Sequence, residues 1–183
     1  MAVLPILTYG DKILRKTAQP VEDITPELIT LAKDMLDTMY EAPGIGLAAP
    51  QVGHSIRLIV VDVNRYEYDI EDDEIVEDNE KDPYILFNPE IIDSSGSCAE
   101  EEGCLSVPGI NSNVVRPEVI TIKALDQNGN EIVLKDIDDI LARCIQHEMD
   151  HLEGILFVDK IGKTDKLLLS GKLKKLARET KAR

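Results

Sequence analysis

The sequence predicts an α+β fold in which mostly antiparallel strands pack around a central helix, with an N-terminal helix and a C-terminal helix. Apolar residues recur at helical spacing in residues 26–41 and 138–152, and a third helix is expected over 164–180. The strand-like segments cluster between the helices instead of alternating with them, which favours α+β over a doubly wound parallel sheet. With 183 residues, 43% of them hydrophobic, the chain fits a single domain over residues 1–183.

The first predicted helix covers residues 26–41. Thr25 can cap this helix, and Pro26 suits its first turn. Pro43 and Gly44 end it. Its apolar face is formed by Leu28, Leu31, Ala32, Met35, Leu36 and Met39.

Short strands are expected after this helix. The segments Arg57–Val63 and Tyr84–Phe87 are rich in apolar and β-branched residues. Val119–Leu125 and Glu131–Leu134 alternate, and the Asn128-Gly129 pair between them is a strong hairpin signal. These four segments therefore supply the predicted sheet.

Charge is distributed unevenly along the chain, whose net charge is −15. Residues 69–82 hold nine acidic residues in fourteen, which predicts a solvated loop rather than a buried element. A chain with this net negative charge would repel the phosphates of nucleic acids, which argues against a general nucleic-acid binder. DNA is therefore not an expected partner. From Lys160 onward, however, nine basic residues face two acidic ones. This basic C-terminal helix, residues 164–183, either serves solubility or meets an anionic partner.

The cysteines and the apolar runs indicate in which cellular compartment the protein is expected. Cys98, Cys104 and Cys144 are an odd number, and no secretion signal is recognised, so a disulfide framework is not expected. The densest apolar run, Leu58–Val61, is far too short to cross a bilayer. We therefore expect a cytoplasmic protein without a membrane partner.

The helix over residues 138–152 carries the chemistry. On a helical wheel its polar and apolar residues separate, with His147 at the edge of the apolar arc and both Glu148 and His151 inside it. The polar face holds Asp139, Arg143, Gln146, Asp150 and Glu153, and the arc expected to be buried holds Ile140, Leu141, Cys144, Ile145, Met149 and Leu152. An ionised carboxylate inside an apolar arc is costly unless it is paired, which favours a metal site in the core over a surface glutamate.

The pattern His147-Glu148-Met149-Asp150-His151 fits that site. Spacing i, i+4 lets two imidazoles reach one ion, and the glutamate between them can act on the water that the ion binds. The third ligands of two common metalloprotease classes are missing, because position 157 is Phe where one class has His, and the only glutamate downstream of Glu153 is Glu179 in the basic tail. A third ligand must therefore come from upstream, and a thiolate is the natural candidate.

Spacing alone does not decide which cysteine that is. Cys144 and His151 would be about 10 Å apart along one helix axis, too far to share an ion comfortably. Cys98 and Cys104 lie in a loop-like stretch rich in Ser, Gly and Glu, and the glycines that flank Cys104 favour it modestly. A non-catalytic site closed by Cys98 or Cys144 as a fourth ligand, and a general metallopeptidase, are the competing hypotheses.

A small-residue segment, Gly44–Gly53, has two interpretations. Its Gly44-x-Gly46-x-x-Ala49 pattern matches the permissive form of a dinucleotide-binding fingerprint. That motif has to follow a strand and open a helix, whereas this one follows a helix and runs into Pro50. The favoured interpretation is a backbone that lies beside an extended substrate, with the Gln51 amide as a neutral donor next to it.

Three segments together resemble the peptide deformylase family. They read GIGLAAPQVG at 44–53, EGCLSVP at 102–108 and QHEMDHLEG at 146–154, and the resemblance extends from residue 5 to about residue 160. It implies a metal-dependent hydrolase that removes the N-terminal formyl group from formyl-methionine of new polypeptides and releases formate. Arg143 stands where some members carry an apolar residue, and the wheel places it on the polar face, away from the core.

The resemblance also implies roles for individual residues. One ion per chain would be held, typically Fe²⁺ and replaceable by Ni²⁺, Co²⁺ or Zn²⁺. The implied metal ligands are Cys104, His147 and His151, and Glu148 would act as the general base and acid. The Gln51 amide and the Leu105 N–H would be the donors to the oxyanion. Gly46 would bond to the substrate through its backbone, and Ile45 and Cys144 would line the pocket for the methionine side chain. The implied partners are nascent formyl-methionyl peptides and the ribosome, contacted through the basic C-terminal helix.

Overall fold

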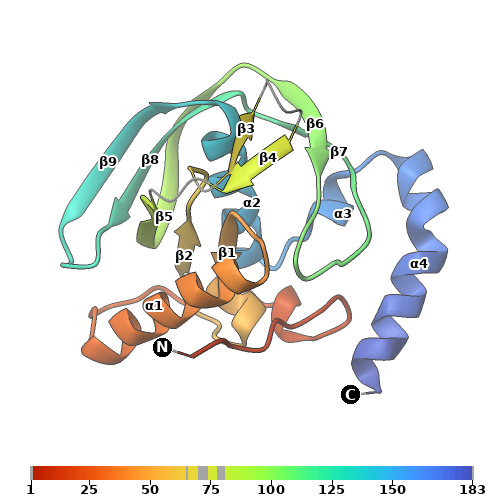
Figure 1. The fold of residues 1–183 in the computed structure, drawn as a ribbon, viewed down its shortest axis with the longest axis horizontal. Helices are drawn as coiled ribbons and strands as arrows, with labels where there is room; N and C mark the ends of the chain where they lie inside the picture. The colour runs from red at the N-terminus through yellow and green to blue at the C-terminus, as the bar shows by residue number, and fades with distance from the viewer. Residues whose placement is uncertain (1, 65, 70–73, 78–80, 183) are drawn as a thin grey trace.

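The computed structural model describes residues 2–64, 66–69, 74–77 and 81–182, and it has the predicted α+β architecture (Figure 1). The helices are η1 (Ile13–Arg15), α1 (Pro26–Glu41), η2 (Ala49–Val52), α2 (Asp139–Leu152), α3 (Phe157–Lys160) and α4 (Lys163–Lys181). The strands are β1 (Gly46–Ala48), β2 (Leu58–Val61), β3 (Tyr66–Asp69), β4 (Glu74–Glu77), β5 (Tyr84–Ser95), β6 (Cys98–Glu102), β7 (Ser112–Arg116), β8 (Val119–Leu125) and β9 (Glu131–Ile137).

A five-stranded antiparallel sheet in the order β1-β2-β5-β8-β9 forms the centre of the fold. The four residues of β2 are fully buried because helices cover both faces of the sheet. Leu58 and Val60 join the cluster that contains Met35 of α1, whereas Ile59 and Val61 join the cluster that contains the α2 residues. Because successive side chains of a strand point to opposite faces, the apolar residues of β2 are divided between the two core clusters.

Helix α1 begins and ends where the sequence predicts. Ala32, Met35 and Met39 are fully buried, and Pro26 occupies the first turn. The Thr25 prediction is only half right, because Thr25 stands at the N-cap position but its side chain makes no capping hydrogen bond. Its hydroxyl instead lowers the pKa of the neighbouring Glu27 carboxyl.

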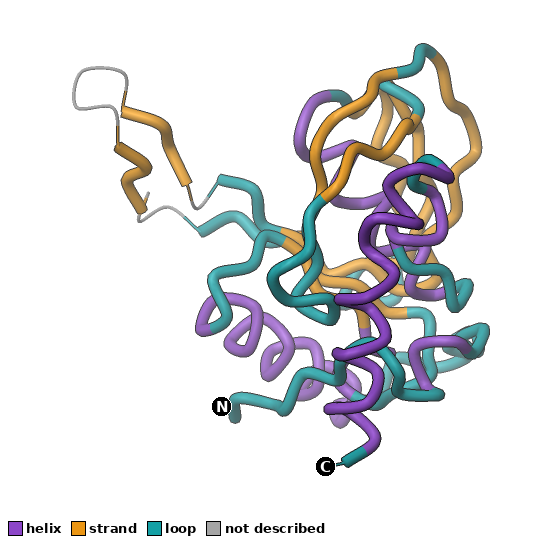
Figure 2. Tube along the Cα trace, turned by 90° about the vertical axis from the view of Figure 1, so that its right-hand side faces the viewer, coloured by secondary structure: helices purple, strands orange, loops and turns teal. Residues whose placement is uncertain are grey.

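Several strands differ from their predicted bounds. β2 is shorter than residues 57–63, whereas β5 continues to Ser95 and β9 to Ile137. The prediction of a loop over 69–82 is wrong at Asp69 and at 74–77, because β3 and β4 pair as antiparallel strands that extend away from the rest of the chain (Figure 2). It is confirmed at 81–82, and 70–73 and 78–80 lie outside the described residues. The acidic count hid the strand propensity of Tyr66, Tyr68, Ile75 and Val76.

A second hairpin, β6–β7, was not predicted. Cys98 belongs to strand β6 and not to a loop, and its register partner is Arg116 of β7. The three consecutive glutamates of β6 give no apolar alternation. This strand is fixed by its pairing with β7 and by contacts with α2, which a local pattern does not report.

Helix α2 lies between the five-stranded sheet and the β6–β7 hairpin (Figure 1). The middle of its polar face is covered, because Arg143 is only 7% exposed and Gln146 only 5%, whereas Asp139 and Glu153 are exposed. The Arg143 and Gln146 side chains bond to the segment 98–117 that packs over them. Conversely Ile140, which the wheel placed in the buried arc, is 49% exposed.

Helix α4 packs along the outside of the domain (Figure 2). Leu173 is its buried contact with the cluster around Phe157 of α3, a short helix that the sequence did not predict. Near its end the Thr180 hydroxyl donates to the Tyr9 carbonyl at 3.0 Å. No helix in the described part of the chain is long and apolar enough to cross a membrane.

Candidate metal centre

Two imidazoles project from neighbouring turns of α2. His147 and His151 are both buried, and their ring centroids lie 5.2 Å apart. Ile145 and Leu152, which flank them on α2, are fully buried against the sheet and fix the rotation of the helix. The apolar arc therefore presents both rings to the interior, as the helical wheel predicts.

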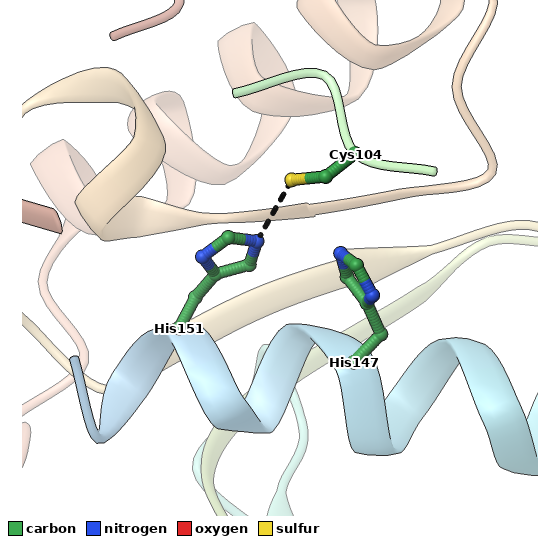
Figure 3. Close-up of side chains that lie close together, drawn as sticks. All are labelled: Cys104, His147 and His151. Carbon is green, nitrogen blue, oxygen red and sulfur yellow. Dashed lines mark hydrogen bonds between the residues drawn. The ribbon is translucent and has the colours of Figure 1, made fainter. Parts of the chain in front are cut away.

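The third member of the group comes from the loop that follows β6. Cys104 Sγ lies 3.3 Å from His151 Nε2, and ligand atoms of Cys104, His147 and His151 lie within 4.8 Å of one another (Figure 3). The other two cysteines are engaged elsewhere: the Cys98 thiol donates to Glu100 at 3.2 Å and the Cys144 thiol to the Ile45 carbonyl at 3.4 Å. Burial raises the pKa of Cys144 well above its ordinary range, so it remains a thiol.

Hydrogen bonds set the orientation of the two rings differently. His147 Nδ1 lies 2.9 Å from Glu102 Oε2, which leaves Nε2 for the side of Cys104. His151 Nε2 is the nitrogen next to Cys104, and its buried Nδ1 has no partner in the described structure. Burial and the charges of His147 and Arg116 lower the pKa of His151 well below its ordinary range, so this ring is neutral.

Glu102 is itself held by two buried arginines. Arg116 donates to both of its carboxylate oxygens, and Arg143 Nη1 donates to Oε1 at 2.7 Å. Burial alone would raise the pKa of Glu102, but the Arg116 and His147 hydrogen bonds outweigh burial and lower it to about 2. The carboxylate is therefore ionised and fixed beside the outer nitrogen of His147.

The surroundings of His147 stabilise a positive charge on this ring, unlike those of His151. Burial lowers the pKa of His147, but hydrogen bonds with Cys104 and Glu102 outweigh it and raise this pKa to about 10. One thiol sulfur and two imidazoles are a donor set that suits divalent first-row ions. The residues present thus fit a metal ion.

Glu148 lies next to this group in an apolar setting. It is 4% exposed, and its Oε2 has no hydrogen-bond partner in the described structure. Burial raises its pKa to about 7, against the lowering effect of the His147 and Arg116 charges. A carboxyl group with a pKa near neutrality can both take up and release a proton at working pH.

Gln51, which belongs to η2, lies beside Cys104. Its Oε1 accepts from the Ala48 N–H at 2.7 Å, which leaves the amide nitrogen to point inward. Nε2 donates to Ser106 Oγ at 3.2 Å and lies 3.7 Å from Cys104 Sγ. These contacts fix the orientation of the amide, with its nitrogen on the side of Cys104.

A cavity of about 480 Å³ opens beside these groups. Its lining includes Ile45, Gly46, Gln51, Cys104, Leu105, Cys144, His147 and Glu148. Gly46 belongs to β1, which is an edge strand of the sheet, so one side of its backbone is not used in sheet pairing. All nine residues that the sequence singled out thus meet in one place, since His151 completes the group at Cys104.

Sequence reasoning missed the groups that support the site. Arg143 was assigned only to the polar face of the helix, and Arg116 and Ser106 were assigned no role. The one signal available was the position of Glu102 within the EGCLSVP segment, two residues before Cys104. The arginines carried no signal, because their partner is distant in sequence.

Known proteins are similar to this chain in both sequence and fold. A family model described as polypeptide deformylase matches residues 3–167. Peptide deformylase 1 of Shewanella oneidensis is 45% identical over 179 residues, covering 98% of each chain. The crystal structure of a peptide deformylase from Legionella pneumophila has a TM-score of 0.82 at 43% identity and covers 100% of this chain and 99% of its own. The Ehrlichia chaffeensis peptide deformylase in complex with actinonin has a TM-score of 0.81 at 38% identity, covering 96% and 98%.

Proposed function

The chain belongs to the polypeptide deformylase family, and from this premise we propose how its own residues carry out the family reaction. The family is metal-dependent, and the chain is an enzyme that removes the N-terminal formyl group from nascent peptides. The observation that carries the assignment of residues is the group of Cys104, His147 and His151 beside Glu148, whose Oε2 has no hydrogen-bond partner among the described residues.

In this proposal Cys104 Sγ and the Nε2 atoms of His147 and His151 hold one divalent ion. We assign Fe²⁺ as the native ion, and the same donors accept Zn²⁺, Ni²⁺ or Co²⁺. When bound, such an ion polarises the formyl oxygen and lowers the pKa of a coordinated water towards neutrality. Glu102 keeps Nε2 of His147 directed at the site by holding Nδ1 at 2.9 Å.

Glu148 moves the proton. It accepts the proton of the attacking water while the water oxygen bonds to the formyl carbon. It then returns that proton to the amine nitrogen as the C–N bond breaks, which yields formate and a free amino terminus. Its apolar surroundings, which bring its pKa to about 7, suit both halves of this transfer.

Gln51 and Leu105 stabilise the developing oxyanion. The Gln51 amide nitrogen is held in place by Ala48 and Ser106, and the Leu105 N–H follows Cys104 in the same loop. Donors fixed before the reaction need no reorganisation, and loss of one such donor typically costs about 10²- to 10³-fold in kcat.

The substrate peptide lies along the free edge of β1. Gly46 offers its backbone groups there, and its missing side chain leaves room next to Glu148. Ile45 and Cys144 line the cavity on the same side and form an apolar pocket for the methionine side chain. An extended peptide added to a sheet edge gains main-chain hydrogen bonds in this way.

The basic helix 164–183 serves as a ribosome contact in this proposal, and the enzyme acts in the cytoplasm as a single domain over residues 1–183. Lys172, Lys174, Lys175 and Arg178 are exposed on α4, where they can meet phosphate groups. Replacement of these four exposed residues by glutamate, which keeps the packing of α4 through Leu173, is expected to weaken co-sedimentation with ribosomes while activity on free peptide is kept. Unchanged co-sedimentation would reject this contact.

A formate-release assay tests the proposed function. The purified enzyme loaded with Fe²⁺ under anaerobic conditions is expected to release formate from a formyl-methionyl peptide, and a chelator is expected to stop it. The matched unformylated peptide, with its internal bonds, should remain intact. Cleavage of internal bonds without formate release would instead identify a general metallopeptidase.

A further inference from the structure

Arg143 bridges α2 and the β6–β7 hairpin with every nitrogen of its guanidinium. Nη1 donates to Glu102 Oε1 at 2.7 Å and to the Val114 carbonyl at 3.1 Å. Nη2 donates to the Cys98 carbonyl at 3.0 Å, and Nε lies 3.0 Å from Glu100 Oε2. The Arg143 side chain is 8% exposed and Glu102 5%, so their bond forms in a largely water-free layer between helix and hairpin, whereas Glu100 is 53% exposed.

The place of this bridge in the chain links it to the metal ligands. Arg143 stands one turn before His147 on α2, and β6 ends at Glu102, two residues before Cys104. The far side of the Cys104 loop is held separately, because the Ser106 carbonyl accepts from the Tyr9 N–H at 2.8 Å. Arg143 therefore holds the near side of the loop that delivers the sulfur against the helix that delivers both imidazoles.

A second arginine, Arg116, allows the effect of losing Arg143 to be separated from the effect of leaving Glu102 without a partner. Arg116 binds both oxygens of Glu102 and also Asp150 of α2 at 2.8 Å. If Arg143 is replaced, Glu102 keeps a bidentate partner and is not left as an unpaired buried charge. The carbonyls of Cys98 and Val114, in contrast, lose their bond to α2.

From these contacts we propose that Arg143 is a positioning residue of the metal centre. It sets the distance of Cys104 Sγ from the two imidazoles without being a ligand of the ion, and it also contributes to the lining of the cavity. The proposal rests on the assignment of Cys104, His147 and His151 as the ligands. A side chain that places a ligand in this way changes metal affinity typically by about 10- to 100-fold when it is lost.

Titration of the metal-free enzyme with Co²⁺ tests the proposal, because a sulfur-to-cobalt charge-transfer band reports the Cys104 bond itself. Arg143→Met keeps the length of the side chain and removes its donors. Arg143→Lys keeps a positive charge beside Glu102 but has one nitrogen, which does not reach all four acceptors. The matched control is Arg57→Met, since Arg57 joins the other end of α2 to β5 through Glu153 and the Pro89 carbonyl.

We expect Arg143→Met to bind Co²⁺ about tenfold more weakly than the native chain, with a weaker charge-transfer band per bound ion. Arg143→Lys should remain weakened, and Arg57→Met should match the native affinity and band. Thermal unfolding of all variants separates this effect from general stability.

The proposal is overturned if Arg143→Met shows the native affinity and band, even with a lower Tm, or if Arg143→Lys restores both. Should Arg143→Met fail to fold, the Arg143→Lys result decides alone. Absence of the charge-transfer band from the native chain would instead overturn the ligand assignment on which the proposal rests.

Discussion

Substitution of Gly46 by alanine tests the tight contact between β1 and α2. A Cβ atom at this position would lie 2.5 Å from Glu148 Oε1 and 2.6 Å from Cys144 Sγ. Ordinary contacts of a Cβ atom begin at about 3.4 Å. Both neighbours belong to the same buried helix, so they have little freedom to retreat.

The expected effect follows from the size of that overlap. The Glu148 carboxylate has to move by about 0.9 Å to restore normal contact. Misplacement of a catalytic group by about 1 Å can cost about 10²-fold in rate. We therefore expect the kcat/KM of Gly46→Ala for a formyl-methionyl peptide to fall by about two orders of magnitude.

Initial rates of formate release measure this effect, with bound metal determined on the same samples. Gly171→Ala is the matched control, because nothing lies within 4 Å of the added Cβ on the exposed side of α4. It should leave kcat/KM unchanged and stabilise the helix by up to about 1 kcal/mol. If Gly46→Ala keeps kcat/KM within threefold of the native value, the overlap does not constrain Glu148 and the reasoning fails.

Three further predictions concern the site and its support. Glu148→Ala should keep its metal and lose at least about 10²-fold in kcat, measured by metal analysis and formate release, and near-native turnover would discard its role as proton carrier. Cys104→Ser should lose metal whereas Cys98→Ser keeps it, and equal loss from both would contradict the ligand assignment. Because the pKa of folded Glu102 is about 2 against an ordinary 4.5, its ionised form contributes stability at neutral pH that is lost as pH falls from about 4.5 to about 2. Denaturant unfolding across that range should show a loss on the order of 3 kcal/mol, absent from Glu102→Gln, and a flat profile of the native chain would reject it.

Features that depend on neighbours in sequence could be predicted from the sequence. The bounds of α1 and α2, the β8–β9 hairpin and the burial of Glu148 beside two histidines follow from periodicity and from turn chemistry. The His-Glu-x-x-His spacing fixes its own geometry, because residues four apart share one side of any helix. The resemblance to a known family added Cys104, which spacing favoured only modestly.

Only the tertiary structure decided which polar residues face water. The wheel separated Arg143 and Gln146 from the apolar arc correctly, but the segment 98–117 covers these two residues and makes this part of the polar face an ion-pair layer around Glu102. The physical reason is that a periodic pattern reports which residues share a side of an element, whereas the partner of that side is chosen by packing between distant segments. A hydrogen-bonded arginine and a solvated one look alike until the opposing strand is in place.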